Sequence, residues 1–155
     1  MATLSTPTVT LGAIASGKRD VTVAGTMTFT ASDVGHTYRL GIELYGEDLA
    51  GDHLPSGDSG ADDLISTFMW LGGGVLLLRP YKAVSVLAAG TVNFSEKRAI
   101  DTSKLDEDGG TEIVGWADIN TPIIMPRSDE VYAQVTLTTA PISKRSSTVQ
   151  AGFGV

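Results

Sequence analysis

The chain has no cysteine among its 155 residues, and this absence removes several kinds of site at once. Without thiols it can form no disulfide, no zinc–thiolate centre, no iron–sulfur cluster and no cysteine nucleophile. It suits reducing and oxidising compartments equally, so cysteine usage does not indicate where the protein works.

Basic residues are also scarce. Eleven Lys and Arg stand against eighteen Asp and Glu, which gives a formal net charge of −7. Six of the basic residues form three separated pairs, Lys18-Arg19, Lys97-Arg98 and Lys144-Arg145, rather than a stripe. Because phosphate contacts supply most of the affinity for nucleic acid, a nucleic acid partner is not expected.

Histidine occurs only twice, and this argues against catalysis. His36 starts a predicted strand, and His53 follows Asp52 in an acidic loop. Nucleophilic triads need a histidine base, and the sequence contains no GxSxG, P-loop, HExxH or dinucleotide-binding fingerprint. Glycoside hydrolysis needs two carboxylates at a fixed separation in a cleft, whereas the carboxylates here cluster in loops. We therefore expect a protein that is not an enzyme.

Long apolar runs are missing as well. The longest, from Phe68 to Leu78, spans 11 residues and is too short to cross a bilayer, so no transmembrane segment is expected. Residues 1–17 lack the basic start and continuous apolar stretch of a secretory signal. These features leave the compartment open between the cytoplasm and an assembled particle or surface structure.

What the chain does have is alternation of apolar and polar residues with a period of two, which is typical of half-buried strands. The expected inward-facing residues lie in four stretches: 20–31 (Val21, Val23, Met27, Phe29), 36–46 (Tyr38, Leu40, Ile42, Leu44), 130–139 (Val131, Ala133, Val135, Leu137) and 147–155 (Val149, Ala151, Phe153, Val155). Further strands are expected over 8–14, 64–71, 81–94 and 112–117.

Short strands with Gly-, Pro- and Asp-rich connections predict an all-β fold. We expect one domain over residues 1–155, an antiparallel two-sheet β-sandwich of about seven or eight strands. An immunoglobulin-like or jelly-roll-like topology is favoured, and a β-barrel is the alternative. Tyr132 has the opposite parity to Val131 and Val135, so it does not fit the tyrosine corner of immunoglobulin domains.

Acidic residues cluster in two segments, with six carboxylates in residues 47–63 and five in Asp101–Glu112. Carboxylates from loops at one end of a sandwich are the ligands that Ca²⁺ prefers. The candidate metal ligands are Asp48, Asp52, Asp62, Asp63, Asp106 and Asp108. The spacing matches no EF-hand, and the alternative is a pair of solvated loops. A calcium site also requires both loops to lie at the same end of the sandwich.

The apolar run around a triple glycine predicts a hairpin whose two arms are apolar on both faces. It is either covered by the same chain or exposed as an interface with another subunit or a membrane surface. The candidate interface residues of this run are Phe68, Met69, Trp70, Leu71, Val75, Leu76, Leu77 and Leu78. The C-terminal strand adds Phe153 and Val155, because residues 147–155 carry neither charge nor proline to block edge pairing. The alternative is that the terminal strands pair within the domain.

Two aromatic residues are candidates for stacking on a carbohydrate ligand. Tyr45 is predicted to point outward beside the first acidic segment, and Trp116, in the context Gly115-Trp116-Ala117-Asp118, is the second candidate for an exposed ring. Each could instead serve packing, since aromatic side chains supply much of the core area of a domain.

Together these patterns predict a non-catalytic structural or interaction subunit that assembles with itself or with another protein, as in a capsid, filament or surface layer. The alternative is a calcium-dependent module that binds carbohydrate or a membrane surface. Apart from this Ca²⁺, no cofactor is expected.

Overall fold

Two long antiparallel strands, β3 (Lys18–Phe29) and β9 (Gly90–Asp101), pair along their whole length and form the middle of the first sheet. The computed structural model describes residues 1–47, 62–72, 77–106, 111–126, 128–139 and 142–152. The other edge of β3 pairs first with β2 (Thr8–Ala15) and then with β1 (Thr3–Leu4). Two short strands thus share one edge of this sheet.

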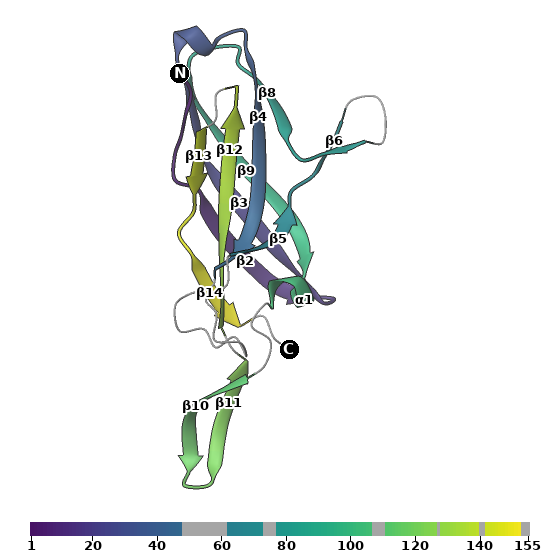
Figure 1. The fold of residues 1–155 in the computed structure, drawn as a ribbon, viewed down its shortest axis with the longest axis vertical. Coiled ribbons are helices and arrows are strands. Elements are labelled where there is room, and N and C mark those ends of the chain that lie inside the picture. The colour runs from purple at the N-terminus through teal and green to yellow at the C-terminus, as the bar shows by residue number, and fades with distance from the viewer. Residues whose placement is uncertain (48–61, 73–76, 107–110, 127, 140–141, 153–155) are drawn as a thin grey trace.

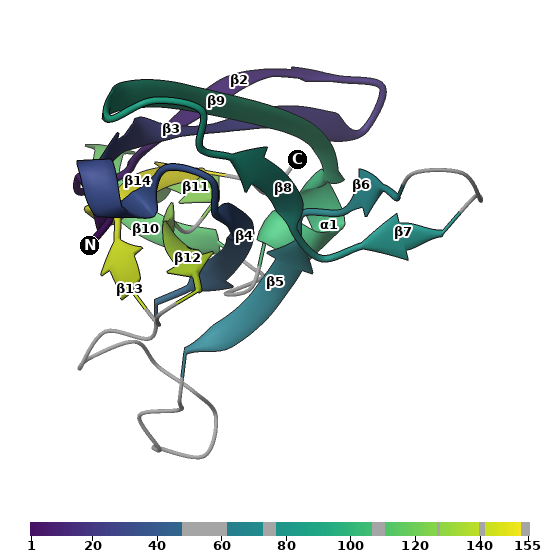
Figure 2. The ribbon, with the colours of Figure 1, turned by 90° about the horizontal axis from the view of Figure 1, so that it is seen from above.

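The second sheet is built around β4 (Thr37–Gly46) and β12 (Ser128–Thr138), which also pair antiparallel. Its outer edges are each made of two short strands: β13 (Ile142–Arg145) and β14 (Val149–Gly152) on β12, and β5 (Asp63–Thr67) and β8 (Lys82–Ser85) on β4. In the described residues no strand pairing joins the two sheets, which lie as two layers in Figure 2. The fold is therefore the predicted antiparallel β-sandwich and not a closed barrel.

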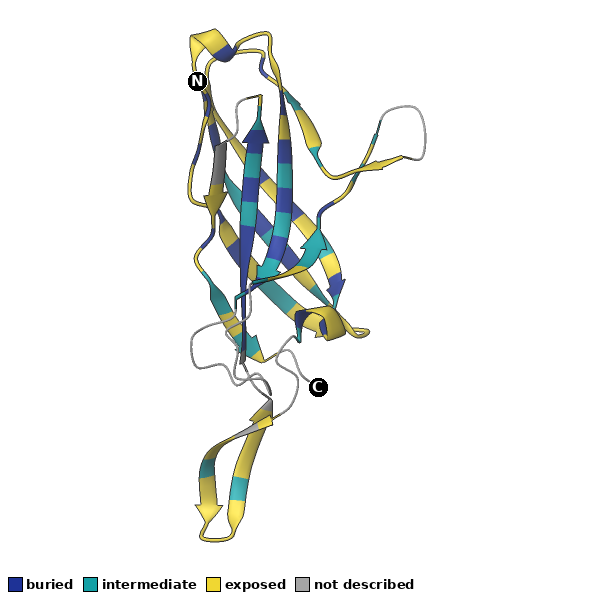
Figure 3. Ribbon diagram, viewed as in Figure 1, coloured by how far each residue is buried: buried dark blue, intermediate teal, exposed yellow. Residues whose placement is uncertain are grey.

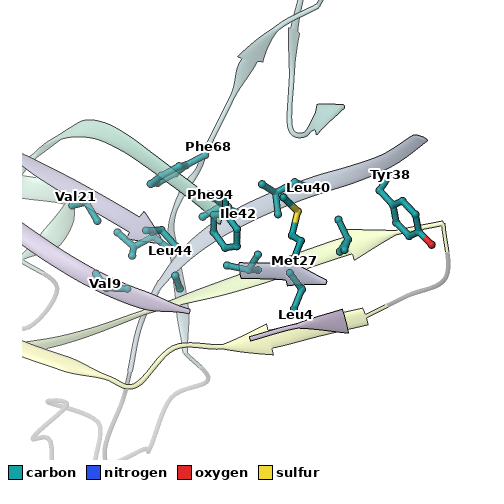
Figure 4. Packing of buried hydrophobic residues seen from close by; sticks show 14 of the residues in the cluster. Leu4, Val9, Val21, Met27, Tyr38, Leu40, Ile42, Leu44, Phe68 and Phe94 are labelled. Carbon is teal, nitrogen blue, oxygen red and sulfur yellow. The ribbon is translucent and has the colours of Figure 1, made fainter. Parts of the chain in front are cut away.

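The core lies between the two layers and comes from the alternating residues of the central strands. Every second residue of β4 is buried, β12 is buried at each of residues 129–133 and then alternates to Leu137, and β3 contributes on the facing side. Figure 4 shows side chains from β3, β4 and β9 gathered between the sheets. The apolar strand residues that are at most 3% exposed are Val21, Val23, Met27, Phe29, Leu40, Ile42, Leu44, Val131, Ala133, Val135 and Leu137. The alternation therefore predicted the inward faces of these strands correctly.

One glycine in β3 is required by close packing. Gly25 pairs with Phe94 of β9, and a Cβ at Gly25 would lie 2.8 Å from Cζ of the Phe94 ring. Because Gly25 has no side chain, the Phe94 ring can lie directly on the backbone of β3. The ring thereby fills the space that a side chain at position 25 would take, and Phe94 is buried.

The crossing from β3 to β4 is fixed by the buried carboxylate of Asp33, in the short 3₁₀ turn η1 (Ala31–Asp33). Its Oδ1 accepts a hydrogen bond of 2.6 Å from the Tyr38 hydroxyl, and its Oδ2 accepts one of 2.7 Å from the Thr30 amide. The Tyr38 hydroxyl, followed by the Thr30 amide, holds the pKa of Asp33 well below its usual range. The carboxylate thus stays ionised and holds the turn between the layers.

Two predicted strands are interrupted in the structure. The stretch 81–94 divides into β8 and β9, which belong to different sheets, and β9 continues through charged residues to Asp101. The stretch 64–71 likewise ends as β5 at Thr67 and resumes as β6 (Trp70–Leu71). The chain leaves one sheet through residues that belong to no strand. Phe68, between β5 and β6, and Val86, between β8 and β9, are such residues, and both are buried. The apolar pattern therefore continues through the two interruptions.

Two hairpins lie outside the sandwich (Figure 1). β6 pairs with β7 (Leu78–Arg79) at the side of the sandwich, and β10 (Thr111–Asp118) pairs with β11 (Thr121–Pro126) beyond one end. A single helical turn, α1 (Thr102–Leu105), precedes the second hairpin. Among the described residues, no helix has the length and apolar character to span a membrane.

Candidate functional site

The β10–β11 hairpin is the most exposed apolar part of the described chain. It extends from the end of the sandwich and is almost entirely exposed in Figure 3. Its large apolar side chains are between 45 and 90% exposed: Ile113, Val114, Trp116, Ile119, Ile123, Ile124 and Met125. Soluble monomers rarely carry so many contiguous exposed apolar residues, and such patches mark interaction sites.

Both faces of this hairpin are apolar. Adjacent residues of a regular strand point to opposite faces, and Ile123, Ile124 and Met125 are consecutive in β11, whereas Val114 lies at a β-bulge in β10. One face could pack on the sandwich, but among the described residues the apolar side chains of both faces stay exposed. A two-stranded ribbon that packs on nothing is marginally stable in water. The amino-acid pattern is therefore that of a ribbon covered on two sides.

The turn at the tip of the hairpin is well defined by local hydrogen bonds. Oδ1 of Asp118 accepts from the Asn120 amide at 2.9 Å, and Oδ2 accepts from the Thr121 hydroxyl at 3.0 Å. These bonds lower the pKa of Asp118, and the bond from the Asn120 amide has the largest effect. The tip therefore carries a negative charge at neutral pH. Ile119, next to this carboxylate, is 90% exposed.

The β6–β7 hairpin is shorter and is anchored to the first sheet. Nε1 of Trp70 donates to Oε2 of Glu96 at 3.2 Å, and Nη2 of Arg98 donates to the Met69 carbonyl at 2.9 Å. The Arg98 guanidinium also lies 5.2 Å from the ring centroid of Phe68 and 5.1 Å from that of Trp70. The base of the hairpin is thereby fixed on β9.

Beyond this base, the β6–β7 hairpin exposes apolar residues. Leu71, Leu77 and Leu78 are all at least 60% exposed, and Met69 is 36% exposed. Phe68, by contrast, is 1% exposed and belongs to the core. Of the interface residues that the sequence suggested, Val75, Leu76, Phe153 and Val155 lie outside the described residues. Each terminal strand is paired inside the domain along one of its two edges: β1 pairs with β3, and β14 pairs with β12.

A concave surface lies between the β6–β7 hairpin and β8. Its volume is about 370 Å³, and it is lined by Trp70, Leu71, Gly72, Arg79, Tyr81 and Lys82, together with Ala83. The Tyr81 ring lies beneath two guanidinium groups, at 4.6 Å from Arg39 and 5.9 Å from Arg79. We call this the Tyr81 surface; it combines apolar walls with positive charge.

Tyr45 is less available than its parity suggested. Its ring stacks on Tyr132 with a centroid distance of 5.5 Å, and its hydroxyl donates to Glu43 at 2.8 Å. Arg145 lies 3.6 Å from the Tyr132 centroid and pairs with Glu47 at 2.5 Å. The ring of Tyr45 is thus part of a packed stack on the outer face of the second sheet. Trp116 is 59% exposed on the β10–β11 hairpin.

Tyr132 itself is buried within that stack. Burial, and then a hydrogen bond of 2.7 Å from its hydroxyl to Oδ2 of Asp62, raise the pKa of Tyr132 to about 12. Asp62 was a candidate metal ligand, and in the structure its carboxylate accepts the hydrogen bond from the Tyr132 hydroxyl.

The remaining candidate metal ligands are only partly described. Asp48, Asp52 and Asp108 lie outside the described residues, Asp63 begins β5, and Asp106 follows α1. Among the residues that the structure does describe, no three acids or histidines come close enough to hold a metal ion. Calcium binding therefore stays a prediction.

The β10–β11 hairpin was missed as a unit by the sequence analysis, although residues 112–117 were expected as a strand. The signal was the Asp118-Ile119-Asn120-Thr121 turn between two apolar runs. Pro122 and Pro126 in the second run count against a strand in general, but they are tolerated on the edge strand of a ribbon.

Comparison with known proteins finds no matching family model, and no curated protein sequence matches the chain. The two hairpins and the Tyr81 surface are therefore the features from which a function can be inferred.

Proposed function

We propose that this protein is a non-catalytic structural subunit that assembles with further copies of itself, and that the β10–β11 hairpin is its principal contact. The observation that carries the proposal is the exposure of seven large apolar side chains on both faces of a ribbon that stands clear of the sandwich. Covering this ribbon removes apolar area from water, at roughly 25 cal/mol per Å².

The distribution of charge supports the same proposal. Carboxylates are collected in two segments, while the hairpin between Thr111 and Pro126 carries only Glu112 and Asp118 as charged residues. A low charge density favours desolvation of the ribbon in an interface. Such an interface resembles a core divided between two subunits, which is typical of permanent assemblies.

The strand order supports an immunoglobulin-like scaffold for this subunit. When each divided edge is counted as one strand, the first sheet contains strands A, B and E, and the second contains D, C, F and G. The groupings A-B-E and C-F-G are those of immunoglobulin domains, where hairpins and loops at the two ends carry recognition. The β10–β11 hairpin is then an insertion between strands E and F.

The experiment is a measurement of solution mass across a concentration series by light scattering after size exclusion. Wild-type protein should exceed the 16.2 kDa monomer mass, with a mass that rises with concentration. A variant with Ile113→Thr, Trp116→Thr and Ile124→Thr keeps the β propensity of the ribbon and should remain monomeric.

A matched control removes exposed apolar side chains from the sandwich instead. The variant with Ile14→Thr, Val34→Thr and Leu87→Thr alters three residues that are also exposed, and it should assemble like the wild type. A wild-type monomer at every concentration would contradict self-assembly. Equal masses for the wild type and the hairpin variant would exclude the hairpin as the contact.

A further inference from the structure

Among the described residues, Arg79 lines the Tyr81 surface without a carboxylate partner, whereas Lys82, which also lines it, pairs with Glu96 at 2.6 Å. Arg39 and Arg79 both approach the Tyr81 ring, and within the described part of the chain neither forms an ion pair. Arg145 and Arg98 differ, since each lies within 4 Å of a glutamate. An anion that approaches Arg79 in the concavity is therefore favoured, and Arg39 on the same ring adds to the positive field.

The shape of this surface is held by the β6–β7 hairpin. The Arg79 side chain lies across Gly72, where a Cβ would come within 2.5 Å of its Nε. Trp70, held by Glu96, forms a wall, and Leu71 is exposed next to it. An occupant of this concavity therefore meets apolar walls and a guanidinium together.

The tip of the β10–β11 hairpin has the complementary pattern. Asp118 carries a fixed negative charge, and the next residue, Ile119, is the most exposed large apolar side chain of the described chain. No Lys or Arg occurs between Thr111 and Pro126. The tip thus offers one carboxylate beside one large aliphatic group, which matches a cationic rim around an apolar hollow.

The two features cannot meet within one molecule. The β10–β11 hairpin lies at one end of the long axis, and the β6–β7 hairpin leaves the side of the sandwich toward the other end (Figure 1). A second copy is therefore needed to bring them together.

We infer that the β10–β11 tip of one copy docks on the Tyr81 surface of the next, with Asp118 against Arg79 and Ile119 against Trp70 and Leu71. This inference rests on the proposed self-assembly and specifies its geometry. The contact joins two different surfaces, so it is heterologous and repeats head to tail into a ring or a filament.

The competing occupant is the hairpin of a second copy, paired with its own kind. The free edge of β10 is the only one suited to this, since Pro122 and Pro126 interrupt the edge of β11. Antiparallel pairing of two β10 strands around Gly115 would place Glu112 opposite Asp118 of the other copy, twice. Like charges opposite each other destabilise a sheet, which favours the head-to-tail contact.

The test uses charge reversal on each side of the contact. Asp118→Arg reverses the charge of the tip and leaves the Tyr81 surface unchanged. Arg79→Glu reverses the charge of the Tyr81 surface and leaves the tip unchanged. Each variant alone should show an apparent dissociation constant raised about tenfold or more. Mixed in equal amounts, they match the intact tip of one with the intact surface of the other, and the reversed tip with the reversed surface. Native mass spectrometry should therefore find mixed assemblies in which the two variants alternate, from the heterodimer upward. The double variant should regain assembly.

The controls separate this inference from the proposed function. Lys104→Glu replaces a positive by a negative charge, as Arg79→Glu does, but on an exposed residue of α1, and it should leave assembly unchanged. Circular dichroism spectra should be the same for all variants. If Arg79→Glu assembles like the wild type while the Ile113, Trp116 and Ile124 variant is monomeric, the hairpin is the contact but the Tyr81 surface is not its receptor. If the mixture of the two variants gives no heterodimer, the head-to-tail geometry is likewise excluded. If the Ile113, Trp116 and Ile124 variant still assembles, the proposed function fails as well.

Discussion

Trp70 donates its indole N–H to Glu96 at 3.2 Å, and this bond ties the β6–β7 hairpin to the long strand β9. The same carboxylate accepts a hydrogen bond of 2.6 Å from Lys82 of β8. Through these two bonds Glu96 of β9 joins the β6–β7 hairpin and the edge strand β8 to the first sheet. Glu96 is only 9% exposed, so this junction is buried. The Tyr81 surface depends on this arrangement, because Trp70 and Lys82 both line it.

Glu96→Ala should lower the free energy of unfolding by about 1–3 kcal/mol, because it leaves the Trp70 N–H and the Lys82 ammonium without their acceptor. Chemical denaturation followed by Trp fluorescence measures this change. Asp20→Ala, on the same sheet, removes an exposed pair with Lys97 at 3.8 Å and should cost less than about 1 kcal/mol. Equal effects of the two substitutions would contradict the role of Glu96.

Leu44→Ala tests the position of the core. Leu44 is 0% exposed between the sheets, so truncation should cost about 2–5 kcal/mol. Leu87→Ala makes the same chemical change at a residue that is 88% exposed and should leave the stability nearly unchanged. Thermal or denaturant unfolding distinguishes them, and a small effect at Leu44 would place the core elsewhere.

The raised pKa of Tyr132 predicts a late step in the alkaline titration of the tyrosines. Burial and Asp62 favour the neutral phenol, so Tyr132 should ionise near pH 12 rather than 10 in the folded protein. The stability that this group contributes is complete below pH 10 and is lost as the pH rises through about 12. Ultraviolet absorbance follows the ionisation.

Variants assign that late step. Tyr132→Phe should abolish it, and Asp62→Asn should lower the pKa of Tyr132 because the anionic acceptor is gone. Tyr81→Phe, far from Asp62 in the sequence, should leave the step in place. If the late step persists in Tyr132→Phe, it belongs to another tyrosine.

Amide hydrogen exchange should distinguish the hairpin from the sandwich. In dilute monomer, the amides of residues 111–126 should exchange much faster than those of β3, because the ribbon packs on no third strand. At concentrations that favour assembly, the same amides should become protected while β3 stays as it was. Unchanged hairpin exchange on assembly would show that the ribbon is not buried in it.

Alternation in the sequence predicted the inward faces of the central strands, since side-chain direction in a strand follows the period of two. Leu40, Ile42 and Leu44 are buried, and their neighbours are half-buried or exposed, as this pattern requires. The run at Phe68–Leu78 was likewise recognisable as a hairpin. Its first residue, however, turned out to be part of the core, because apolar character alone does not show which neighbour covers a side chain.

Residue type and spacing are sufficient to establish that the chain is all-β, which residues of the main strands point inward, and that charge gathers in two segments. These are local properties, set by residue type and spacing. The pairing of distant segments establishes that β8 and β9 lie in different layers, that the Asp118 hairpin stands apart from the sandwich, and that Arg39 and Arg79 both lie close to the Tyr81 ring. Such relationships arise from pairing between residues distant in the sequence, and no local period encodes which partner a strand or a cation meets.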